Sequence, residues 1–328
     1  MTFSLFKKKL YYSIHSIAPL SASSCILGWY AFVVSVIEFD KEKWMFHVIV
    51  GGGLLFLLPW FITLMHRWLP SRIIIPTKTN DDHPLNGKVS LVISSIFEQK
   101  GDLILSYNRN NIAGGLVINE YNKPTLNLMG QFMHKYFPAS KKESAQFDWS
   151  AFKACYDSPN TYIYYLNEQN KLVTFDKQAV PPHDVTNAKK ATVLLPKGSV
   201  IALKLPAGAD REYAYLLCNT YYRPDQSMSA ITNMDELEIC LSTVWRVVSL
   251  LHPGGHNVCI PFLGKGYSGL TEHSYGVLWT IVFTYRKASS LYGVYNYGIN
   301  ICLPISILAS NNLQIWEAAR FMSYALRG

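Results

Sequence analysis

The sequence is short of charged residues: Asp, Glu, Lys and Arg make up only 16% of its 328 residues, whereas 49% are hydrophobic. It also lacks repeats and low-complexity tracts. This composition excludes a disordered or collagen-like chain. The first 88 residues hold nine basic and five acidic residues and the rest hold 21 and 17, so the net charge of +8 is shared equally. No strongly basic region remains that would indicate binding to nucleic acid.

Paired cysteines and a clustered set of histidines are missing as well. The six cysteines are scattered and include no CxxC pair, which is typical of a reducing compartment. His252 and His256 are four residues apart, but Pro253-Gly254-Gly255 between them excludes the helix that would put both on one face. The sequence therefore predicts a loop at this point and no metal site.

Charged residues are absent from two long stretches, 28 residues at 10–37 and 23 residues at 44–66. A membrane-spanning helix needs about 20 mostly apolar residues. We predict a transmembrane hairpin in residues 1–69, with spans at 17–37 and 44–65. The alternatives are a cleaved signal peptide for the first segment and a buried core helix for the second. Lys7 to Lys9 and Arg67 flank the hairpin, while its turn at 38–43 has a net charge of −1, so both termini are expected in the cytoplasm.

The remainder reads as a linker followed by one domain. Residues 70–87 are polar and contain Pro76 and Pro84, which is typical of a linker, and residues 88–328 have the length of a single domain. Apolar, β-branched runs predict strands at 89–96, 103–107, 161–166, 192–205 with a break at 196–198, 213–220, 258–263 and 298–303. Helical patterns occur at 126–136, 235–251, 275–289 and 313–326. This alternation predicts a three-layer α/β domain with a mixed sheet.

One segment has the pattern of an anion-binding site. The apolar strand at 258–263 runs into Gly264-Lys265-Gly266-Tyr267-Ser268-Gly269-Leu270 and then into a helix. Glycines let backbone N–H groups approach an anion, and the positive end of the helix dipole stabilises it. The alternative is a glycine turn without a ligand.

Three familiar glycine motifs do not fit this loop. A dinucleotide fingerprint needs an acidic residue about 20 positions on, and none occurs between Glu272 and Glu317. A Walker loop needs glycine where Cys259 stands and Ser or Thr where Gly266 stands. A nucleophile elbow needs glycine at the position of Leu270.

The residues of this loop resemble a sequence motif of a known protein family. Pro-Phe-Leu-Gly-Lys-Gly-Tyr-Ser-Gly at 261–269 is similar to the PxLGTGxxG phosphate loop of macrodomains, which are α/β modules that bind ADP-ribose. The strand at 103–111, which ends in asparagines, resembles their distal-ribose loop, and residues 126–133 resemble the opening of their first helix. Two membrane spans before such a domain resemble the transmembrane macro effector of type II Thoeris, a bacterial anti-phage system. The resemblance covers nearly the whole chain.

The resemblance implies a receptor rather than an enzyme. A TIR-domain enzyme activated by phage would make a histidine-ADP-ribose type of signal from NAD, and the macro-like domain would bind it. Ligand-induced homo-oligomers would then disrupt the lipid bilayer of the bacterial inner membrane and abort the infection. No cofactor and no catalytic residue are implied. The expected ligand-binding residues are Gly264, Lys265, Gly266, Tyr267, Ser268, Gly269, Leu270, Asn108, Asn110 and Gln131.

The sequence also departs from catalytic macrodomains. Those that hydrolyse ADP-ribosyl bonds usually carry an Asn-Ala-Ala-Asn run followed by glycines, but Arg109 interrupts the asparagines here. The Gly-Asp adenine signature is replaced by Ile93-Ser94-Ser95-Ile96. Binding is therefore favoured over hydrolysis. A membrane-tethered ADP-ribosyl hydrolase is the alternative, and a sensor that docks partner proteins at the membrane is a third.

Overall fold

The chain divides into two units, residues 1–71 and 72–328. The computed structural model describes residues of the second unit alone, namely 72–75, 88–113, 116–118, 124–139, 147–184, 193–222, 230–263, 274–292, 297–310 and 313–327. The hairpin expected in residues 1–69 lies outside them. Within these ranges, every helix is too short or too polar to cross a bilayer.

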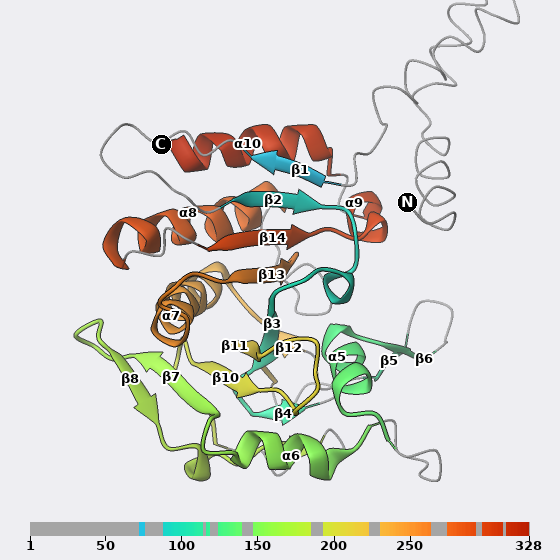
Figure 1. Cartoon of the computed structure of the whole chain (residues 1–328), viewed down its shortest axis with the longest axis vertical. Helices are drawn as coiled ribbons and strands as arrows, with labels where there is room; N and C mark the ends of the chain where they lie inside the picture. Colours follow the sequence, from blue (N-terminus) through green and yellow to red (C-terminus); the bar gives the residue numbers. More distant parts are fainter. Residues whose placement is uncertain are drawn as a thin grey trace, which may run out of the picture. The chain divides into compact units, whose positions relative to one another are not determined.

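A ten-stranded mixed sheet forms the centre of the second unit (Figure 1). Five neighbouring strands at its middle are parallel, and the strands on either side of them are antiparallel. The parallel strands are β2 (Val89–Val92), β14 (Gly298–Cys302), β13 (Asn257–Pro261), β3 (Asp102–Asn108) and β11 (Tyr213–Tyr222). The antiparallel strands are β1 (Arg72–Ile75) beside β2, then β10 (Val200–Lys204), β7 (Tyr162–Leu166) and β8 (Leu172–Phe175) beyond β11, with β12 (Ala230–Ile231) also paired to β11. The predicted mixed sheet is confirmed.

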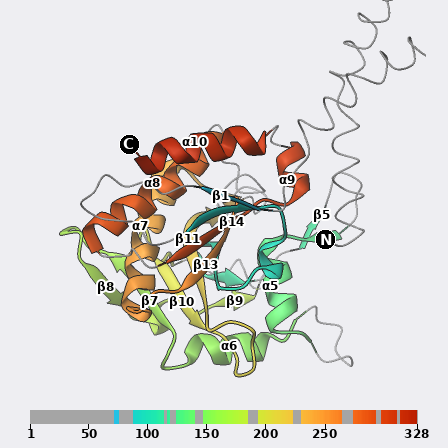
Figure 2. The ribbon, with the colours of Figure 1, turned by 45° about the horizontal axis from the view of Figure 1, so that its top comes forward.

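Helices cover both faces of this sheet (Figure 2). On one face, α5 (Leu128–Tyr136) and α6 (Trp149–Asp157) share a buried cluster with Leu103 and Leu105 of β3. On the other face lie α7 (Met234–Leu251), α8 (Ser274–Tyr292) and α10 (Ile315–Arg327), and the indole N–H of Trp245 in α7 donates to Thr284 of α8. Side chains of a strand alternate between faces, so both faces of β3 are buried. The three-layer α/β architecture is therefore confirmed.

Short elements complete the described chain. Two small sheets pair β4 (Ile112–Ala113) with β9 (His183–Asp184) and β5 (Leu116–Ile118) with β6 (Pro124–Leu126). The remaining helical turns are η2 (Ile96–Glu98), η3 (Lys177–Ala179) and α9 (Ile305–Ser310). The strand predicted at 89–96 ends at Val92, and the helical turn η2 follows it. Ser95 caps η2 by accepting the N–H of Phe97.

Two predictions about the start and middle of the domain need correction. Residues 72–75 lie in the predicted linker, but they form β1 and pair with β2, because three successive isoleucines follow Arg72. Helix α6 was missed although its signals are present. Asp148 caps it by accepting the N–H of Ala151, and Phe152 and Tyr156, four residues apart, bury one face.

Candidate functional site

The candidate site lies at the edge of the sheet where the five parallel strands end, called the carboxyl edge below. Ligands of α/β sheets bind in the loops at this edge. β13 ends at Pro261, and the described chain resumes at Ser274 as the first residue of α8. The expected order of strand, loop and helix is therefore confirmed on both sides of the glycine loop. Residues 264–270 themselves lie outside the described chain.

Asn108, an expected ligand-binding residue, is the last residue of β3 at this edge. Its Nδ2 donates to the carbonyl of Ile112 at 2.6 Å, and its Oδ1 accepts the N–H of Ile112 at 2.9 Å. The side chain is buried. Both polar atoms of the amide thus stabilise the conformation of residues 108–112. These residues are called the asparagine turn below.

Asn111 ties the asparagine turn to the layer of α6. Its φ of 55° lies in the left-handed region, which asparagine adopts more readily than most residues. The fully buried amide donates to the hydroxyl of Tyr156 at 2.9 Å and to the carbonyl of Val180 at 2.6 Å. Its oxygen accepts the hydroxyl of Tyr107 at 3.1 Å. Asn110, another expected ligand residue, lies between Asn108 and Asn111 in the sequence and is buried.

Two basic side chains, Arg109 of the asparagine turn and Lys197, contact one buried carboxylate. The Nε of Arg109 donates to the carbonyl of Leu195 at 2.9 Å, and its Nη1 lies 3.6 Å from Oε1 of the buried Glu236. Lys197 lies 3.8 Å from the same oxygen. Glu236 is in the first turn of α7, where the helix dipole stabilises a carboxylate. In the sequence Arg109 stands out only as a departure from the family pattern, and Lys197 carries no signal, because Glu236 joins the two from a distant helix.

Helix α5 begins at the carboxyl edge. Asn127 caps it by accepting the N–H of Gly130, and Gln131, the third expected ligand residue in the described chain, is exposed in its first turn. At the other end, Lys135 and Tyr136 donate to Asp210 at 3.1 and 2.9 Å. Asp210 precedes β11, so the helix runs antiparallel to the parallel strands. Its N-terminus therefore lies on the same side of the sheet as the asparagine turn.

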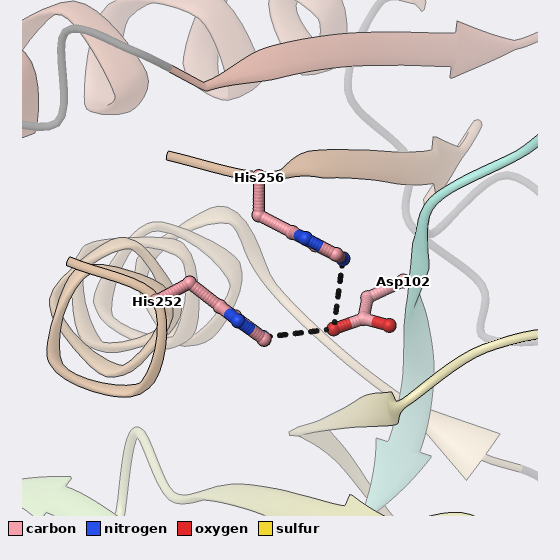
Figure 3. Close-up of side chains that lie close together, drawn as sticks. All are labelled: Asp102, His252 and His256. Atoms are coloured by element: carbon pink, nitrogen blue, oxygen red, sulfur yellow. Dashed lines mark hydrogen bonds and ion pairs between the residues drawn. The ribbon is translucent and has the colours of Figure 1, made fainter. Parts of the chain in front are cut away.

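A second cluster lies at the opposite, amino edge (Figure 3). Asp102 begins β3, His252 follows α7, and His256 precedes β13. Oδ2 of Asp102 is 3.1 Å from Nε2 of His252 and 3.4 Å from Nε2 of His256. Burial raises the pKa of Asp102, but hydrogen bonds from His256 and Tyr213 outweigh it, so the net pKa is lowered. The hydrogen bond to Asp102 raises the pKa of His256.

The predicted loop between the two histidines is confirmed, and this loop brings both imidazoles to the same oxygen of Asp102. Gly255, with a φ of 93°, turns the chain back, and its N–H donates to the carbonyl of His252 at 3.1 Å. The two imidazole rings consequently stack, with centroids 4.2 Å apart and planes 9° from parallel.

Comparison with known proteins gives a family match. The family model described as "Thoeris protein ThsA, Macro domain" matches residues 89–304. No curated protein matches the chain.

The chain is also similar to solved macrodomains. A mutant Oceanobacillus iheyensis macrodomain is 13% identical, with a TM-score of 0.39 over 76% of this chain and 99% of that one. The O. iheyensis macrodomain with MES bound is 10% identical, with a TM-score of 0.37 over 78% and 96%. The Trypanosoma brucei macrodomain in complex with ADP-ribose is 10% identical, with a TM-score of 0.36 over 77% and 78%.

Proposed function

Because the chain belongs to the family of the Thoeris protein ThsA macro domain, we propose that its α/β domain binds an ADP-ribose-derived signal at the carboxyl edge. The observation that carries this proposal is the family match itself, because it spans both the asparagine turn and the unit of β13, glycine loop and α8. The signal is of the histidine-ADP-ribose type, made by a partner TIR-domain enzyme.

The charges at the carboxyl edge suit a diphosphate. Helix α5 begins on this side, and α8 begins after the loop that leaves β13. The positive dipole ends of both helices favour an anion. Arg109 and Lys197 share one carboxylate, that of Glu236. These three side chains together therefore keep a net positive charge at the asparagine turn. Backbone N–H groups of Gly264 to Gly269 would complete the phosphate site.

The domain acts as a receptor in this proposal. Hydrolysis of an ADP-ribosyl bond needs a group that activates water, and an amide cannot serve as a general base. The amide of Asn108 is also occupied by Ile112. Glu236, the carboxylate that contacts Arg109 of the asparagine turn, is held by two cations. These contacts favour binding without turnover.

The membrane part would carry out the response. We place residues 1–69 as a hairpin in the bacterial inner membrane, with both termini in the cytoplasm. Two helices cannot enclose a polar pathway, because every lipid-facing backbone group must stay paired. Membrane disruption therefore requires several subunits, and the signal must favour the assembled state. Shifting a population from 1:99 to 99:1 takes about 5.5 kcal/mol, which several bound ligands can share.

The direct test uses the full chain in detergent, titrated by calorimetry with ADP-ribose and with its histidine conjugate. We expect binding, recovery of the conjugate intact after long incubation, a much larger species by light scattering, and leakage of liposomes containing the protein. Release of free ADP-ribose that stops in Asn108→Ala would instead establish the hydrolase. Leakage without a change in size would refute ligand-induced assembly.

The topology needs its own measurement. A reporter fused after Gly328 should be protected from reagents outside intact cells, because Lys7 to Lys9 and Arg67 favour the cytoplasmic side. Labelling of that reporter from outside would overturn the orientation without affecting ligand binding.

A further inference from the structure

We propose that Asp102, His252 and His256 form a zinc site at the amino edge of the sheet, separate from the signal site proposed above. Each residue offers one ligand atom, and the three atoms lie within 4.8 Å of one another. Two imidazole nitrogens and one carboxylate oxygen are a donor set that zinc prefers, whereas calcium and magnesium take oxygen ligands.

Two of the three distances between the ligand atoms fit tetrahedral coordination. Zinc bonds to nitrogen and oxygen are about 2.0–2.2 Å long, so neighbouring ligand atoms of a tetrahedral site lie about 3.3–3.5 Å apart. The oxygen of Asp102 is 3.1 and 3.4 Å from the two histidine nitrogens. Zinc would replace these two hydrogen bonds, and the two stacked imidazole rings would turn so that each nitrogen lone pair points at the ion.

Contacts behind the carboxylate orient it for this role. Asp102 is 1% exposed. Its Oδ1 accepts the backbone N–H groups of Glu212 and Tyr213 at 3.1 and 3.0 Å. Its Oδ2 faces the histidines and also accepts the hydroxyl of Tyr215 at 3.5 Å. Hydrogen bonds from outside the coordination sphere are the usual way in which proteins fix a metal-binding carboxylate.

The histidines are held through their own backbones. The carbonyl of His252 accepts the hydroxyl of Tyr297, and the carbonyl of His256 accepts the N–H of Gly298 at 3.2 Å. The three ligands thus come from the start of β3, the end of α7 and the residue before β13. A bound ion would join these three segments at one point.

An opening beside the cluster supplies the remaining coordination position. A cavity of about 370 Å³ is lined by Gly101, Gly254, Gly255, His256 and Asn257. Three of these five residues are glycines, so few side chains obstruct it. Because three protein ligands leave one tetrahedral position, a water molecule from this cavity would complete the site.

The test measures zinc affinity in the full chain in detergent, without a polyhistidine tag and after treatment with a chelator. Titration against a chromophoric zinc indicator should give one ion per chain. His256→Ala should weaken binding by at least about tenfold, since even indirect supports of a metal site cost that much. His134→Ala is the matched control, because His134 is exposed on α5 and belongs to no cluster of potential metal ligands within the described residues.

Thermal unfolding gives a second readout on the same proteins. Zinc should raise the midpoint in the parent and in His134→Ala but not in His256→Ala, whereas magnesium should have no effect on any of them. His256 is only partly buried, so its replacement leaves the core intact. Equal zinc affinity in the parent and His256→Ala would overturn the proposal and leave a metal-free hydrogen-bonded triad. Binding of ADP-ribose, measured in parallel, should be the same in both.

Discussion

The two ends of β3 carry buried polar groups that are held in different ways. At the carboxyl end, Asn108 exchanges both of its hydrogen bonds with Ile112, four residues away. At the amino end, Asp102 binds Glu212 and His252, which are 110 and 150 residues away. Asn108 is thus held within its own turn, whereas Asp102 is held by segments that are distant along the chain. Loss of Asp102 should therefore disturb several segments at once.

The largest effect should come from Asp102→Ala at the amino edge. The change leaves two buried N–H groups and two histidines without their acceptor, so the free energy of unfolding should fall by about 3–5 kcal/mol. Denaturant unfolding of the full chain measures it. Asp157→Ala is the control, because Asp157 is half exposed and pairs with Lys153 on the surface of α6. A loss no larger than that of the control would mean that the amino edge contributes little to stability.

A smaller loss is expected from Asn111→Ala at the carboxyl edge. The variant loses three buried hydrogen bonds and leaves alanine in the left-handed region, so the expected cost is about 2–3 kcal/mol. Asn170→Ala is matched to it, because Asn170 has a φ of 58° but is exposed in the turn after β7. Equal losses in Asn111→Ala and Asp102→Ala would mean that the two edges contribute alike to stability, and a larger loss in Asn111→Ala would reverse the expected order.

Gly266→Glu should affect binding rather than stability. It puts a negative charge where the diphosphate of the signal is expected, so affinity should fall at least tenfold, or about 1.4 kcal/mol. Gln169→Glu adds the same charge at the β7–β8 turn and should bind like the parent. Calorimetry with ADP-ribose distinguishes the two. Unchanged affinity in a folded Gly266→Glu protein would move the phosphate site away from this loop.

The smallest effect should be at Asp210, which joins α5 to the amino edge. Hydrogen bonds from Lys135 and Tyr136 outweigh desolvation and lower the pKa of Asp210 below the usual 3.8. A lowered folded-state pKa stabilises the protein above pH 3.8, and this contribution is lost as the pH falls through the folded-state value. Asp210→Asn should cost less than about 1 kcal/mol at pH 7. The difference from the parent should shrink as the pH falls below 3.8, and a difference that does not change with pH would exclude the carboxylate charge as its source.

The sequence predicted the elements that have strong local patterns. Helices α7 and α8 and strands β3, β11 and β13 were expected within a few residues of their observed bounds, because apolar periodicity reports which face is buried. Helix α6 and strand β8 were missed, since each is short and borders polar turns. The glycine loop lies between a strand and a helix, as predicted. The ligand contacts of its residues and the membrane hairpin at 1–69 stay predictions.

What the sequence by itself determined is the succession of strands, turns and helices, because backbone preferences and burial periodicity act over a few neighbouring residues. Only the tertiary structure decided which side chains meet at the amino edge. Val258 of β13 pairs in register with Asp102 of β3, so His256, two residues earlier, arrives beside that carboxylate. The fold of the loop after α7 then brings His252 to the same oxygen. This register is set by packing across the whole sheet, and no pattern within either segment encodes it.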